Sequence, residues 1–172
     1  MSDSKKKAAT AGAKPEAQSQ VNNEEKQLNI LKLYVQNSSI EVPNVKTIFS
    51  GNWVPELNIS VSTKVDDVAG KKNSHHVALT VKCDVASNKE RAFIVEVTQC
   101  GIFSIPESDA DTMKHILNVF CPNVLYPYLR ESVTDIVSKA GFPQLALAPI
   151  NFEMMLAQQE EGKKTSKKSA KN

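Results

Sequence analysis

An apolar segment with two prolines, residues 142–150 (FPQLALAPI), constrains the fold of this chain more than any other feature. Pro143 and Pro149 prevent a regular helix, because proline lacks the backbone donor and its ring clashes with the preceding turn. A connection between elements normally faces water, so an apolar connection needs a partner surface. We therefore expect this segment either to be buried at a subunit contact or to be held available for an apolar ligand.

The residues before this segment are spaced as a helix. Apolar positions recur at steps of three and four: Leu125, Tyr128, Leu129, Val133, Ile136, Val137 and Ala140. We expect Asn123 to cap this main helix, Pro127 to lie in its first turn, and Gly141 to end it in a left-handed conformation.

Two shorter helices are predicted on either side of it. The first has Met113, Ile116, Leu117 and Phe120 on one face, with Ser108 as its cap and Pro122 at its end. The second begins at Asn151 and carries Phe152, Met154, Met155 and Leu156.

Upstream, four segments alternate between apolar and polar residues, which is typical of strands with one buried face. They are residues 28–40, 56–65, 75–85 and 91–99. Gly101 permits a bulge or bend before residues 102–105. Strands followed by helices predict an α+β fold, a four-stranded antiparallel sheet with helices packed on one face.

The connection 45–54 contains two large rings and is predicted to be irregular or briefly helical. For Phe49 we favour a place in the core. Trp53 lies between Gly51 and Pro55 at a strand entrance, where contact with a ligand is a serious alternative.

The composition of the two ends differs from that of the middle. Neither end can bury enough apolar surface to offset the entropy of ordering it. We expect a disordered N-terminal extension (1–27), one folded domain (28–157) and a disordered basic C-terminal tail (158–172). The net charge of +2 owes much to these lysine-rich ends, so it is weak support for nucleic-acid binding.

The sequence does not predict an enzyme, a cofactor or a metal site. His75 and His76 are adjacent in a strand and point to opposite faces, and His115 with Asp111 one turn away is most simply a surface contact. The three cysteines have no metal-ligand spacing, and Cys83 is in phase with a buried strand face. No secretory signal or membrane-spanning stretch is apparent, so we expect a cytoplasmic protein.

Several longer motifs occur in a fixed order: Glu41-x-Pro43-Asn44, Trp53-x-Pro55-Glu56, GIFSI (101–105), CPNVLYPYLRE (121–131) and GFPQLALAPINF (141–152). Together they closely resemble SecB, the bacterial protein-export chaperone family, over about residues 28–156. The resemblance implies a homotetramer built as a dimer of dimers. It also implies binding of unfolded secretory preproteins without ATP, and their delivery to the translocation motor SecA.

The resemblance also implies two sets of functional residues. A client-binding groove maps to the crossover, the helix-connecting loop and the last helix: Trp53, Phe142, Leu145, Leu147, Met154 and Met155. A SecA-binding surface on the sheet maps to Glu41, Ile94 and Glu96. Asn37 stands where that surface often has an acid, and the lysine-rich tail departs from the acidic or mixed tail common in the family.

The alternative within the same fold is a SecB-like chaperone dedicated to a narrow client, such as a toxin–antitoxin system. Capture of a single client would support the dedicated chaperone, whereas capture of many clients would support the export chaperone.

Overall fold

The computed structural model describes residues 27–71 and 73–169, with side chains as far as Gly162. Residues 1–26, most of the expected N-terminal extension, lie outside the described residues. The elements, in order, are β1 (Asn29–Glu41), α1 (Val45–Ile48), β2 (Pro55–Asp67), β3 (Ser74–Ser87), β4 (Glu90–Ser104), α2 (Ala110–His115), the π-helical turn η2 (Ile116–Phe120), α3 (Cys121–Lys139) and α4 (Phe152–Ser169).

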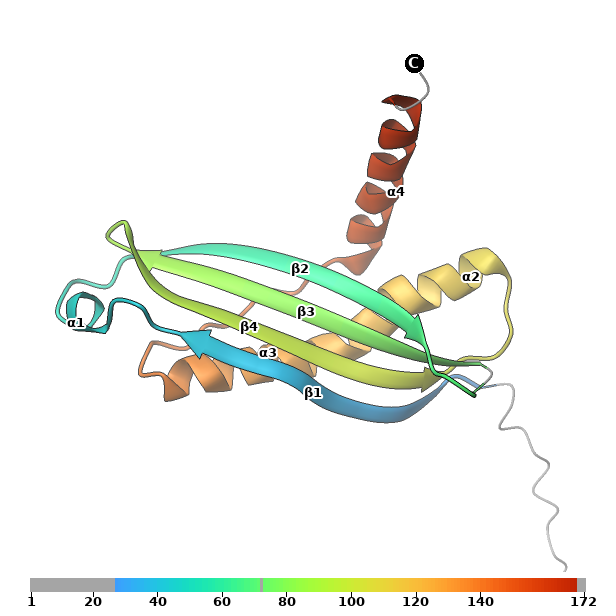
Figure 1. The fold of residues 1–172 in the computed structure, drawn as a ribbon, viewed down its shortest axis with the longest axis horizontal. Helices are drawn as coiled ribbons and strands as arrows, with labels where there is room; N and C mark the ends of the chain where they lie inside the picture. Colours follow the sequence, from blue (N-terminus) through green and yellow to red (C-terminus); the bar gives the residue numbers. More distant parts are fainter. Residues whose placement is uncertain (1–26, 72, 170–172) are drawn as a thin grey trace, which may run out of the picture.

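The four strands form one antiparallel sheet in the order β1-β4-β3-β2, which confirms the predicted α+β fold class. β1 and β2 are consecutive in the chain but occupy opposite edges of the sheet. The connection 42–54, which contains α1, therefore crosses the end of the sheet beside the turn that joins β3 to β4 (Figure 1).

One face of the sheet is buried under helices and the other is largely polar. Val81 lies opposite Val97 and Cys83 opposite Val95, and all four side chains are fully buried. α3 packs against β4, β3 and β1 on this side (Figure 1). The alternate positions carry Lys82, Glu96 and a hydrogen bond between the hydroxyls of Thr80 and Thr98. The prediction of one dry and one wet face is confirmed.

The helical layer is more continuous than the sequence indicates. Pro122 does not end a helix: α2, η2 and α3 follow one another without a break, and Pro127 lies inside α3. Asn123 is likewise not the cap of α3, whose preceding residue Phe120 is already helical. The missing proline donors are tolerated because a buried stripe continues through them to Val137, and tertiary packing outweighs local propensity.

The cap of the first helix is Asp109, not Ser108, because the Asp109 carboxylate accepts a hydrogen bond from the Thr112 amide at 2.9 Å. That hydrogen bond lowers the pKa of the Asp109 carboxyl below its usual value. Gly141 has φ +87° after the last turn of α3, as predicted.

Gly101 does not introduce a bulge into β4. β4 runs unbroken through it and pairs Gly101 with Val77 and Leu33 without a register shift at that point. A Cβ atom there would lie 2.5 Å from the Phe103 ring and 3.0 Å from Leu125 of α3. The glycine therefore allows close packing of side chains over β4, which is a different role from the predicted bulge.

α4 begins where predicted, with the Asn151 side chain accepting a hydrogen bond from the Met154 amide, but it is not short. It extends past residue 157, the end that composition suggests for the folded domain, and it rises away from the sheet in Figure 1. α4 contacts α2 through an ion pair of Lys114 with Glu160 and a hydrogen bond between His115 and Glu153. The acidic partner of His115 is thus Glu153 and not Asp111.

Candidate functional site

Four aromatic rings meet where the connection 42–54 reaches the end of α3. Phe142 is central: its ring centroid lies 4.9 Å from that of Phe49, 5.5 Å from that of Trp53 and 4.6 Å from that of Phe93. We call these four residues the ring cluster. Gly141 makes this arrangement possible, because its left-handed backbone ends α3 and redirects the chain so that Phe142 packs in the core.

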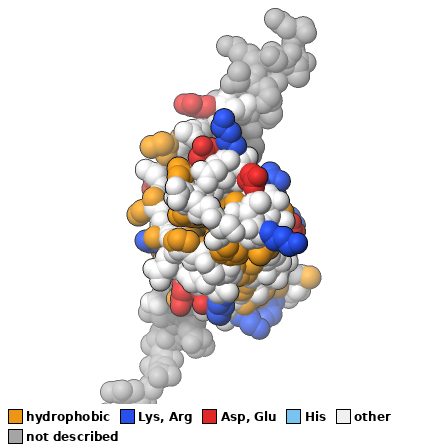
Figure 2. Space-filling view, turned by 90° about the vertical axis from the view of Figure 1, so that its left-hand side faces the viewer, with side chains coloured by type: hydrophobic (Ala, Val, Ile, Leu, Met, Phe, Trp, Pro, Cys, Tyr) orange, Lys and Arg blue, Asp and Glu red, His pale blue; other side chains and the backbone are white. Residues whose placement is uncertain are grey.

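The ring cluster is graded from buried to exposed. Phe93 is 2% exposed and Phe142 6%, whereas Trp53 is half-buried and Phe49 is 52% exposed. The prediction that Phe49 belongs to the core is therefore wrong; its ring stacks on Phe142 at the surface. Figure 2 views the end of the molecule that carries α1, and hydrophobic side chains reach the surface there.

Apolar exposure continues from the ring cluster along the β2 edge. Val54 is 57% exposed, Leu57 41% and Ile59 47%, and among the described residues β2 has a neighbouring strand on one side only. Leu57 and Ile59 share the helix-covered side of the sheet, since they lie opposite the core residues Val85 and Cys83. Together with Phe49 and Trp53, these three residues form an exposed apolar strip, of which Trp53 is the most buried member.

The other predicted groove residues lie further along the chain, in the connecting segment 140–151 and in α4. Leu145 is half-buried against the core, and Leu147 is 2% exposed within it. Met155 also packs against the core, while Met154 is 57% exposed at the base of α4. The structure brings Trp53 and Phe142 together, whereas the two methionines lie with α4, which packs on η2.

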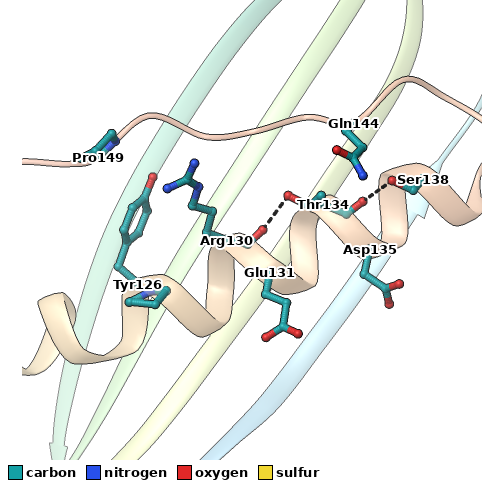
Figure 3. A pocket seen from close by; sticks show the side chains of 9 residues that line it. Tyr126, Arg130, Glu131, Thr134, Asp135, Ser138, Gln144 and Pro149 are labelled. Carbon is teal, nitrogen blue, oxygen red and sulfur yellow. Dashed lines mark hydrogen bonds between the residues drawn. The ribbon is translucent and has the colours of Figure 1, made fainter.

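The connecting segment is not sealed inside the protomer. It runs beside α3, where the Leu145 and Ala148 carbonyls accept hydrogen bonds from Thr134 and Tyr126 respectively. Between the two lies a surface pocket of about 690 Å³. Its lining consists of Tyr126, Pro127, Arg130, Glu131, Thr134, Asp135, Ser138, Gln144 and Pro149. Figure 3 shows Arg130 pointing towards this segment, with Glu131 and Asp135 turned the other way.

The three residues mapped to a SecA-binding surface gather on the polar face of the sheet. Glu41 of β1 pairs directly with Ile94 of β4, and Glu96 lies two residues further on the same face. Lys82 lies opposite Glu96 on β3, so this surface is charged but not uniformly acidic.

The thiols in the described residues are poor nucleophiles. Burial raises the pKa of Cys83 to about 11 and that of Cys121 to about 12, so both are protonated at neutral pH. His75 and His76 have different partners, Asp67 and Tyr34, as expected for opposite faces. The described residues include no group of three or more His, Cys, Asp or Glu side chains placed to hold a metal ion. Within the same part of the chain, no helix is long and apolar enough to cross a bilayer.

Sequence reasoning missed Phe49 as a surface ring and missed the polar residues that hold the connection 42–54 in place. Asn88 donates a hydrogen bond to the Asn52 carbonyl at 2.7 Å, and Ser87 accepts one from the Val54 amide at 3.0 Å. A turn is implied between the predicted strands 75–85 and 91–99, but no local pattern indicates that it contacts a segment so far away in the chain.

Comparison with known proteins supports the family resemblance that the sequence motifs indicate. The family model described as "Preprotein translocase subunit SecB" matches residues 20–163. The protein-export protein SecB of Legionella pneumophila is 43% identical over 141 residues, covering 82% of this chain and 86% of that protein. The protein of the same description from Thiobacillus denitrificans is 40% identical over 133 residues, covering 77% and 86%.

A solved structure shares the fold. The Mycobacterium tuberculosis SecB-like chaperone, in complex with a ChAD peptide from the HigA1 antitoxin, superposes with a TM-score of 0.58. The match covers 72% of this chain and 91% of that chain at 14% identity, which is a likeness of fold alone.

Proposed function

The chain belongs to the SecB family of protein-export chaperones, and we propose that it binds unfolded preproteins in the cytoplasm, keeps them competent for translocation and delivers them to SecA. The observation that carries the proposal is the ring cluster, which leaves Phe49 and Trp53 accessible beside an apolar strand edge. The higher identity to export proteins than to the antitoxin-bound chaperone favours export clients over a dedicated antitoxin.

An exposed apolar strip suits clients that share no sequence. Burial of apolar area contributes about 25 cal/mol per Å² whatever side chain supplies it, so such a surface is promiscuous. Aromatic side chains add contact area at little cost in conformational entropy, because they have few rotatable bonds. In this proposal Trp53, Phe142, Leu145, Met154 and Met155 contribute to client binding, with Leu147 supporting the segment from the core.

We also propose a homotetramer, a dimer of dimers. In the part of the chain that the structure describes, β1 is an edge strand, and it supports self-assembly because it carries Ile30, Leu31 and Val35, each at least 45% exposed. An exposed strand edge with apolar side chains is readily paired by another chain. Light scattering of the purified full chain tests this part, and a monomeric mass would contradict it.

Replacing Trp53 by alanine is expected to weaken client binding about tenfold or more, because truncation of a central aromatic contact typically costs about 2 kcal/mol. The ring is half-buried against the core, so the variant should still fold, with a denaturation midpoint lowered by a stability loss of about 1–2 kcal/mol. Fluorescence anisotropy of a labelled unfolded preprotein measures the affinity, and the same preprotein in its folded form is the control. Unchanged affinity of the variant for the unfolded preprotein would show that Trp53 is not part of the client-binding surface. Wild-type protein that ignored the unfolded form would refute the proposed function itself.

Replacing Glu96 by lysine is expected to weaken SecA association on the order of tenfold without changing client affinity, because reversal of a rim charge acts mainly on electrostatic association. The new lysine would also face Lys82 across β3 and β4. Titrations of SecA at low and high salt should differ less for the variant than for the wild type. A parallel loss of client affinity would mean that the two surfaces are not separate.

A further inference from the structure

The turn between β3 and β4 makes a row of contacts with the connection 42–54. Four residues at the tip of the β3–β4 hairpin each make one hydrogen bond with the connection: Ser87 with the Val54 amide, Asn88 with the Asn52 carbonyl, Glu90 with the Thr47 hydroxyl, and Arg91, through its carbonyl, with the Asn44 side chain. The contacts follow from topology. Because β1 and β2 lie at opposite edges, the connection between them has to pass the end of the β3–β4 hairpin.

These contacts flank the exposed Phe49 ring and the half-buried Trp53 ring. Thr47 is held two residues before Phe49, while Asn52 and Val54 are held on either side of Trp53. The shortest of the four hydrogen bonds is the one from Asn88 Nδ2 to the Asn52 carbonyl, at 2.7 Å. Gly51 lies under the same side chain, since a Cβ atom there would be 3.9 Å from Asn88 Nδ2.

The conformation of the turn is fixed by its own residues and by those next to it. Asn88 and Lys89 have φ of +54° and +69°, the left-handed pair of a tight hairpin turn. Asparagine tolerates this conformation better than most residues. Arg91 at the base of the turn is fixed by two hydrogen bonds to the Asp84 carboxylate, at 2.9 and 3.0 Å.

We infer that Asn88 is a positioning residue for client capture, which holds the connection 42–54 so that Phe49 and Trp53 stay stacked on Phe142 with one side open. This inference rests on the proposed function, because it takes the ring cluster to be the client-binding surface. Most of the connection is exposed, so packing alone fixes it weakly. A segment fixed before binding loses less conformational entropy when a client arrives, which raises affinity.

Trp53 reports its own position, because it is the only tryptophan of the chain. The experiment compares Asn88→Gly with Lys89→Gly in the full chain. Both glycines suit a positive φ and add the same backbone freedom, but only the first removes a hydrogen bond to the connection. Asn88→Asp is a second variant, which keeps a residue that tolerates the left-handed conformation and replaces the donor by an acceptor.

Iodide quenching of Trp53 without client, and anisotropy titration with an unfolded preprotein, are the two readouts. We expect both Asn88 variants to show higher quenching and about two- to tenfold weaker client binding, the usual effect of losing one hydrogen bond. Lys89→Gly should match the wild type in both. Equal quenching in Asn88→Gly and Lys89→Gly would overturn the inference. Increased quenching in the Asn88 variants with client affinity equal to that of the wild type would overturn it as well. Failure of the wild type to bind any unfolded preprotein would refute the proposed function, while the quenching comparison would still decide whether Asn88 positions Trp53.

Discussion

Replacing Gly101 by alanine should destabilise the protomer by about 3 kcal/mol, at the upper end of what one extra methyl group costs in a packed core. The new methyl would lie 2.5 Å from Phe103 Cε2, 2.8 Å from Phe103 Cζ and 3.0 Å from Leu125 Cδ2. Phe103 and Leu125 are both fully buried, so neither side chain can swing into solvent to relieve the contact. β4 or α3 would have to shift instead.

Chemical denaturation at fixed protein concentration measures this loss, with Gly51→Ala as the control. A Cβ atom on Gly51 would meet nothing closer than 3.7 Å, which is an ordinary contact, and Gly51 does not have a positive φ. The control should therefore retain nearly all of the wild-type stability. A Gly101→Ala variant as stable as Gly51→Ala would show that the space above β4 is not tightly filled.

Replacing Phe142 by alanine is expected to cost about 3–4 kcal/mol of stability, the range typical of truncating a buried phenylalanine. Its ring is 6% exposed and contacts three other rings, so its removal leaves a cavity and frees Phe49 and Trp53. Client affinity should fall as well, because the exposed rings lose their support.

Phe49→Ala is the matched control, since it removes the same side chain from the same cluster. Phe49 is 52% exposed, so we expect its loss to cost about 1 kcal/mol, in line with the smaller apolar area withdrawn from water. Comparable stability losses for the two variants would contradict the graded burial of the ring cluster.

The sheet was predictable because the alternation of apolar and polar residues within each strand indicates its two faces. Alternation with period two fixes which side chains of a strand share a face, and the buried series Val77, Leu79, Val81, Cys83 and Val85 follows that rule without exception. Gly141 was predictable for the same reason, since a glycine directly after a helical stripe is a common left-handed end.

The wrong predictions concern residues whose conformation depends on packing against distant segments of the chain. Pro122 and Pro127 suggest helix boundaries locally, but the stripe they interrupt is buried against β4, β3 and β1, and that packing holds one continuous helical layer. Gly101 looks like a bend in isolation, and only the approach of Phe103 and Leu125 explains it. Phe49 is apolar enough for a core, but it lies on the solvent side of Phe142.

Under the proposed function, the ring cluster also sets the stage of synthesis at which the protein can first bind a client. Phe49, Phe93 and Phe142 come from segments far apart in the chain, and the last of them follows α3. Contacts between distant segments form late, and a ribosome releases the N-terminal segments first. A nascent copy that has emerged only as far as β4 therefore lacks the ring on which the other three assemble. The proposed client-binding surface is therefore completed only when synthesis of this chain is itself nearly finished.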